Sequence, residues 1–226
     1  MDIVQFLIDL FLHLDEHLSY VISQYGVWTY ALLFFVIFME TGFVVTPFLP
    51  GDSLIFAAGT FAAPEASGAP GPLNLWLLLV LLIAAAFLGD TANYWIGHYL
   101  GDRAYKIRWI KQEYIERTHA FFEKHGGKTI LLARFVPIVR TFAPFVAGIG
   151  RMSYGYFISY NIVGGIVWVS LFSMAGYFFG RVPFVQENFT VVVIAIIAVS
   201  VLPMVIEALK ARRESRRAPV KAPETH

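Results

Sequence analysis

Apolar runs of helical length recur along the chain, separated by short breaks that are rich in charge, Pro or Gly. Three of these runs, at 73–100, 154–180 and 189–209, can each supply the roughly 20 apolar residues with which a helix crosses a bilayer. The pattern therefore predicts three transmembrane helices at these positions.

The segment 3–24 has a different pattern, because its acidic residues keep to one side. Asp2, Asp9 and Glu16 recur at intervals of seven residues, and apolar residues fill the positions that a helix places opposite them. A helix with one acidic and one apolar face lies along a membrane surface. We therefore predict an interfacial helix here.

Two further apolar segments, 27–61 and 128–150, contain residues that break helices. The breakers are Pro47, Pro50, Gly51, Pro137 and Pro144. Non-helical backbone at membrane depth persists only where protein or a watery cavity surrounds it. Each segment is therefore predicted to be a re-entrant hairpin, which enters and leaves the membrane on one side.

The two broken segments are similar to each other. FVVTPFLPGDSLIFAAG at 43–59 and FVPIVRTFAPFVAG at 135–148 each contain Phe-Val, two prolines, a further Phe and an Ala-Gly end. Each precedes a predicted transmembrane helix, so the two halves would have opposite orientations in the membrane. Paired broken segments in inverted repeats point to a transporter's binding site. The alternative is a chance likeness, because Phe, Pro and Gly are common in this chain.

The composition excludes an ordinary soluble domain. Hydrophobic residues make up 58% of the 226 residues and charged residues only 15%, whereas soluble domains contain about 25% charged residues. We therefore predict an all-α polytopic membrane protein. All 17 Lys and Arg residues lie between Arg103 and Lys221. Because basic residues favour the cytoplasmic side, we expect a cytoplasmic interfacial helix at 102–127 and a basic, disordered, cytoplasmic tail at 210–226.

Four charged residues lie within the broken segments and form the predicted binding site for substrate and protons. They are Glu40, Asp52, Arg134 and Arg140. One charge at the bilayer centre costs roughly 2.5–3.5 kcal/mol, so the two acids of one half are expected to pair with the two arginines of the other. Arginine binds phosphate with paired hydrogen bonds, and an acid in an apolar pocket can exchange a proton near neutral pH. A purely structural ion pair is the alternative, as is a snorkelling side chain at Arg134.

A secondary polar site is predicted at Asp90, Asn93 and Tyr94, within GDTANYWIGHYLG. An acid at Asp90 must find a partner or water in so apolar a segment. Cys is absent and the histidines have no metal-binding spacing, so we expect no metal site. No nucleophile stands beside a general base. We therefore expect no enzymatic activity, no cofactor and no nucleic-acid partner.

Four runs of the chain closely resemble the DedA family of membrane proteins. They are ETGFVVTPFLPGDSLIFAAG, GDTANYWIG, FFEKHGGKTILLARFVPIVRTFAPFVAG and AGYFFG. The likeness implies one DedA-type membrane domain at 1–209. Members of the family are bacterial inner-membrane proteins, related to VTT-domain lipid scramblases of eukaryotes, and are linked to lipid translocation. The resemblance also implies two facing re-entrant hairpins, with functional acids at Glu40 and Asp52 and functional arginines at Arg134 and Arg140.

The leading hypothesis is a flippase that moves anionic lipid headgroups between leaflets, coupled to the proton motive force, in support of envelope homeostasis. Undecaprenyl phosphate and phospholipids are the candidate lipids, so membrane lipids and protons are the expected partners. One alternative is a proton-coupled antiporter of small cations or drugs. Another is a structural envelope factor, in which the charge pairs only hold the hairpins together. The sequence leaves open which lipid or ion is moved and whether movement is active transport or scrambling. It also leaves open the oligomeric state and the side of the membrane on which the N-terminal helix lies.

Overall fold

The computed structural model describes residues 13–43, 51–65, 67–101, 116, 118–119, 122–123 and 125–199. All regular secondary structure in these ranges is helical, as the apolar pattern predicts. Several predicted features lie outside the described residues, namely 3–12 of the first helix, Pro47, Pro50, most of 102–127, the segment 200–209 and the tail 210–226.

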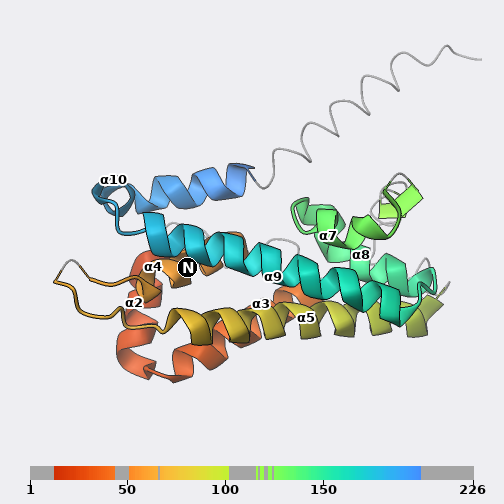
Figure 1. Ribbon diagram of the computed structural model, residues 1–226, viewed down its shortest axis with the longest axis horizontal. Helices are drawn as coiled ribbons and strands as arrows, with labels where there is room; N and C mark the ends of the chain where they lie inside the picture. Colours follow the sequence, from red (N-terminus) through yellow and green to blue (C-terminus); the bar gives the residue numbers. More distant parts are fainter. Residues whose placement is uncertain are drawn as a thin grey trace, which may run out of the picture.

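Two antiparallel helices of 26 residues each set the long axis of the molecule (Figure 1). α5 (Leu75–Leu100) and α9 (Tyr154–Phe179) contact each other, and both are long and apolar enough to cross a membrane. α5 begins where the Asn74 side chain accepts a hydrogen bond from the Leu77 backbone N–H. It ends at Gly101, whose φ of +48° suits a residue without a Cβ.

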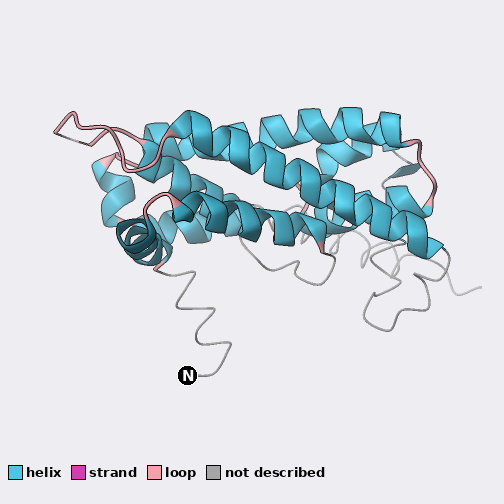
Figure 2. Cartoon of the chain, turned by 90° about the horizontal axis from the view of Figure 1, so that it is seen from below, coloured by secondary structure: helices cyan, strands magenta, loops and turns pink. Residues whose placement is uncertain are grey.

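The first half of the described chain contains α2 (Leu14–Tyr25), α3 (Trp28–Gly42) and α4 (Gly51–Ala62). α3 packs along α5, and α4 packs along α9. Helices α3 and α4 are the two helical parts of the first broken segment, and Gly51 is the first residue of α4. The loop after α4 projects at one end of the molecule (Figure 2).

The second broken segment consists of η2 (Gly126–Lys128), α7 (Thr129–Ala133) and α8 (Pro137–Ile149). Pro137 starts α8, where a missing backbone N–H is tolerated. The prediction that Pro144 breaks the chain is wrong, because α8 continues through it. Proline inside a helix costs about 3 kcal/mol, but here the neighbouring Phe145 is fully buried and α8 packs on α5. Tertiary packing therefore outweighs the local penalty.

Two shorter helices follow α9. α10 (Pro183–Glu187) begins with a proline, and the helix Phe189–Val199 comes after it. The Phe189 ring lies 6.2 Å from the Phe56 ring of α4, between ring centroids. The described part of the predicted third transmembrane helix is therefore helical and packed against the core.

The buried apolar side chains form two clusters. One is shared by α2, α3, α4, the first part of α5, the second part of α9 and the helix Phe189–Val199. The other is shared by the end of α5, α7, α8 and the start of α9. Polar and charged side chains are buried where elements of the two clusters meet.

The two broken segments make matching contacts with the two long helices. Gly176 of α9 lies so close to the Phe56 backbone of α4 that a Cβ has no room there, and Gly97 of α5 lies in the same way against the Phe145 backbone of α8. Both glycines are the 23rd residue of their 26-residue helices. Each broken segment therefore supplies a helix that packs on the long helix of the other half.

Candidate functional site

Arg140 of α8 lies at the centre of a buried cluster of charges. Its Nη1 donates to Asp52 Oδ1 at 2.8 Å, and its Nη2 donates to Glu40 Oε1 at 2.6 Å. The Arg140 side chain is 11% exposed. Both acids come from the first broken segment and the arginine comes from the second, so the pairing expected between the halves is present for these three residues.

The local fold of the first segment holds the two acids together. Glu40 lies near the end of α3, and its Oε1 accepts a hydrogen bond from the Gly51 backbone N–H at 3.3 Å. Asp52 lies in the first turn of α4, where the helix dipole favours a negative charge. The Glu40 carboxylate occupies the space that a Cβ at position 51 would fill. Glycine is therefore required at position 51 for close approach to the acid.

Trp168 completes this cluster from α9. Its indole N–H donates to Asp52 Oδ1 at 2.8 Å, and the Arg140 Cζ atom lies 5.0 Å from its ring centroid, within the range of a cation–π contact. Sequence reasoning missed this residue. A signal was present, because tryptophan in membrane proteins gathers at the two interfaces, whereas Trp168 lies near the middle of the predicted helix at 154–180.

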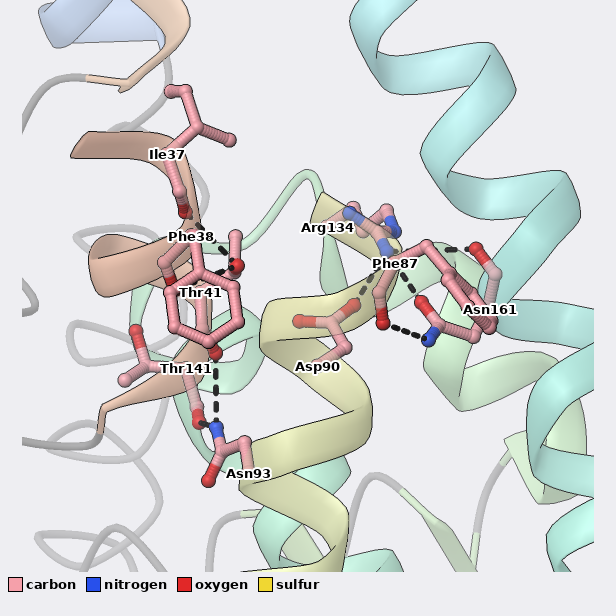
Figure 3. Close-up of polar contacts among 9 residues, drawn as sticks. All are labelled: Ile37, Phe38, Thr41, Phe87, Asp90, Asn93, Arg134, Thr141 and Asn161. Carbon is pink, nitrogen blue, oxygen red and sulfur yellow. Dashed lines mark hydrogen bonds and ion pairs between the residues drawn. The ribbon is translucent and has the colours of Figure 1, made fainter. Parts of the chain in front are cut away.

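Arg134 forms a second cluster, in the break between α7 and α8 (Figure 3). Its Nη2 donates to an Asp90 oxygen of α5 and to Asn161 Oδ1 of α9, the latter at 2.5 Å. Asn161 Nδ2 in turn donates to the Phe87 carbonyl at 3.3 Å. The Arg134 side chain is only 2% exposed, so the alternative that it snorkels to a surface is wrong. Its acidic partner is Asp90, not an acid of the first broken segment as expected, and sequence reasoning missed Asn161.

The other two residues of the predicted secondary site tie helices together. Asn93 Nδ2 donates to the Thr41 carbonyl at 3.2 Å and to the Thr141 carbonyl at 2.9 Å, which joins α5 to α3 and α8 (Figure 3). Tyr94 donates its hydroxyl to the Met152 carbonyl and stacks on a neighbouring aromatic ring. Among Asp90, Asn93 and Tyr94, Asp90 is the residue that forms an ion pair, with Arg134.

The two clusters together contain three carboxylates and two guanidinium groups, from Glu40, Asp52, Asp90, Arg134 and Arg140. If all five are ionised, the Arg134 pair is neutral and the Arg140 cluster has a formal charge of −1. Burying an unmatched charge is costly. The Arg140 cluster is therefore the one that a single bound proton, or another cation, would bring to neutrality. In the described part of the chain, no three His, Asp or Glu side chains are gathered as a metal site requires.

Comparison with known proteins places this site in a family. Residues 49–178 match the VTT domain. The chain is also 52% identical over 221 residues to the protein DedA of Escherichia coli, an overlap of 96% of this chain and 99% of that protein. The chain belongs to the DedA family. Asp52, Asp90, Arg134, Arg140 and Trp168 all lie within the stretch that matches the domain.

Two less similar proteins also match this chain. The chain is 43% identical over 192 residues to the uncharacterized membrane protein Rv0364 of Mycobacterium tuberculosis, which covers 84% of this chain and 82% of that protein. It is 34% identical over 157 residues to the inner membrane protein YqjA of Escherichia coli, which covers 68% of this chain and 69% of that protein. No solved structure matches. Together with the two long apolar helices, these names identify a membrane protein.

Proposed function

We propose that this DedA-family protein moves anionic lipid headgroups, of polyprenyl phosphate or phospholipid, between the two leaflets of its membrane. The observation that carries the proposal is the buried Arg140 guanidinium, held by the Glu40 and Asp52 carboxylates. A guanidinium binds phosphate in the same paired geometry in which it binds carboxylate. A phosphate group can therefore replace one of the two carboxylates as the partner of Arg140.

Charge balance in the Arg140 cluster supports coupling to protons. The cluster already has one acid in excess, so a phosphate that enters it adds negative charge at membrane depth, where charge is costly. Protonation of the acid that Arg140 releases would offset that cost. The Glu40 Oε2 atom is buried and makes no hydrogen bond. We assign the proton to Glu40, and we propose that headgroup and proton move through the site together.

We further propose that the chain is built from two inverted repeats, each with a re-entrant hairpin. The matched glycine contacts support this arrangement, because the long helix of each half receives the hairpin helix of the other half at the same position. Such a two-fold arrangement would place Arg140 of one hairpin against the acids of the other. In transporters with inverted repeats, the substrate site lies at this interface.

The distribution of basic residues favours a location in the bacterial inner membrane with a cytoplasmic C-terminus. The relatives' names support a membrane location, and one of them is named an inner membrane protein. We propose transport without chemistry on the lipid, so the headgroup should be recovered unchanged. The partners are then phosphate-bearing lipids and protons.

Reconstitution into liposomes tests the proposal. The probes are phosphatidic acid and diacylglycerol with the same fluorescent acyl chain, and the readout is their exposure to an impermeant quencher. We expect the wild type to accelerate movement of phosphatidic acid and not of diacylglycerol. Exchange of the partners, Asp52→Arg with Arg140→Asp, should fail to restore transport. Restoration by this exchange would instead support a purely structural ion pair.

The excess of acid over arginine also favours a second candidate, a proton-coupled antiporter of small cations or drugs. In that case a cation would neutralise the Arg140 cluster, and the arginines would be structural. Addition of the transported cation to vesicles would then release protons without any lipid movement. The liposome assay separates the two candidates, because only the first requires a lipid phosphate.

A further inference from the structure

Trp168 lies close to both buried arginines. The Arg140 Cζ atom is 5.0 Å from its ring centroid and the Arg134 Cζ atom is 5.7 Å from it. The side chain is fully buried. Both guanidinium groups are therefore within cation–π distance of one indole ring, although they have different acidic partners.

The indole N–H links this ring to the acid of one cluster. It donates to Asp52 Oδ1, the same oxygen that accepts the hydrogen bond from Arg140 Nη1. An indole N–H has one fixed direction, so it restricts where that carboxylate can lie.

The same face of α9 contacts the second cluster. Asn161 accepts a hydrogen bond from Arg134, and it precedes Trp168 by two helical turns. Between them, a Cβ at Gly164 would lie 2.8 Å from Arg134 Nε. Glycine at this position gives the guanidinium room to lie on the helix. One face of α9 thus contacts Arg134, Arg140 and Asp52.

We propose that Trp168 is a positioning residue that couples the two clusters. Its N–H holds Asp52 and its ring lies against Arg134, so a change in the Arg140 partner alters the surroundings of Arg134. Binding of a phosphate headgroup at Arg140 then changes the stability of the Arg134–Asp90 ion pair, and the Trp168 indole transmits this effect. The identity of the ligand in this inference rests on the proposed function, but the coupling does not.

A double-mutant cycle tests the coupling without any ligand. Asp52→Asn and Arg134→Gln are combined in the full chain, and thermal unfolding is measured in detergent. Sites without shared partners are additive. We expect a deviation from additivity of about 3 °C or more in the wild-type background. In the Trp168→Phe background, which keeps an aromatic ring but lacks the N–H, the cycle should become additive. Trp95→Phe is the matched control, because Trp95 lies outside both clusters. It should leave the deviation from additivity unchanged.

A cycle that is already additive in the wild type would overturn the proposal. So would a deviation that persists in full in the Trp168→Phe background. If Arg134→Gln fails to fold, Asp90→Asn replaces it in the cycle. Asp90→Asn disrupts the same Arg134–Asp90 ion pair from the side of the acid.

A binding experiment tests the same coupling with a ligand. Short-chain phosphatidic acid is added to the purified protein, which contains 5 tryptophans, and the fluorescence emission is recorded. We expect a change in the wild type and in Trp95→Phe that is absent in Trp168→Phe. We also expect Arg134→Gln to weaken binding about five-fold or more in the wild type, and less than about two-fold in the Trp168→Phe background.

An equal effect of Arg134→Gln in both backgrounds would contradict the proposal. The absence of any phosphatidic acid binding to the wild type would instead contradict the proposed function, while the thermal cycle would still decide the coupling.

Discussion

Arg134 and Arg140 lie six residues apart in one broken segment, yet their surroundings differ. Arg134 faces one carboxylate and one amide, and its side chain is 2% exposed. Arg140 faces two carboxylates, and its side chain is 11% exposed. One arginine is matched in charge and enclosed, whereas the other has an acid in excess and is more accessible.

This difference assigns different roles to the two residues. A buried pair with matched charges loses much stability when one partner is removed. It also leaves little reason for a further charged ligand to enter. A cluster with two carboxylates and one guanidinium must bind a proton or another cation to reach neutrality, so the charge state of its acids can change. We therefore assign the holding of helices to Arg134, and the binding of the headgroup to Arg140.

The largest expected effect is the loss of lipid transport in the Arg140→Gln variant. Glutamine cannot supply the charged donors, so the rate of phosphatidic acid movement should fall about 100-fold or more toward background. The liposome quenching assay measures this rate. Arg151→Gln is the matched control, because Arg151 is an exposed arginine just after α8. The transport rate of Arg151→Gln should stay at the wild-type value. A similar fall in both variants would mean that Arg140 has no specific role in transport.

Arg134→Gln should have its main effect on stability. The change leaves Asp90 buried without its guanidinium partner, which costs about 3–5 kcal/mol in the free energy of unfolding. Thermal unfolding in detergent measures the loss. A variant that unfolds like the wild type but no longer moves lipid would show that Arg134 also binds the headgroup.

Replacing both partners sharpens the comparison. Arg134→Met with Asp90→Leu removes both charges of the enclosed pair, so it should recover most of the stability lost in Arg134→Gln. The transport rate should remain measurable. Arg140→Met with Asp52→Leu and Glu40→Gln removes all three charges of the Arg140 cluster, so this variant should also fold but should stay inactive. If the Arg134 double variant were inactive although stable, the assignment of a holding role would be wrong.

The smallest expected effect concerns the amide that supports Arg134. Asn161→Ala removes a buried acceptor and should lower stability by about 1–3 kcal/mol. Gln186→Ala, at an exposed position of α10, should change stability by less than about 0.5 kcal/mol. Chemical unfolding of both variants gives the comparison, and equal losses would mean that Asn161 does not support the pair.

The sequence predicts the Arg140 cluster better than the Arg134 cluster, for a physical reason. Charges in apolar segments must find partners, and the acids at Glu40 and Asp52 were the evident partners for an arginine of the other half. The same reasoning indicates that Asp90 needs a partner, but not which one. Its partner Arg134 is 44 residues away and meets it only through tertiary packing.

Neutral residues of the site were harder to predict. Trp168 and Asn161 lie in a long apolar helix, where their side chains resemble lipid-facing or packing residues until their contacts are known. Pro144 shows a different error. The low helix propensity of proline indicated a break there, but packing of α8 against α5 outweighs that propensity. Helix type and approximate position follow from apolar length, whereas breaks and neutral site residues depend on which helices meet.

The most direct test of the central claim records lipid movement and proton flux in the same liposomes. Vesicles with labelled phosphatidic acid and an internal pH dye receive an imposed proton gradient, with wild type, Arg151→Gln or Arg140→Gln. We predict that headgroup movement and proton flux rise together in the first two and are both absent in Arg140→Gln. Headgroup movement that continues at the wild-type rate in Arg140→Gln would contradict the assignment of this arginine as the headgroup site.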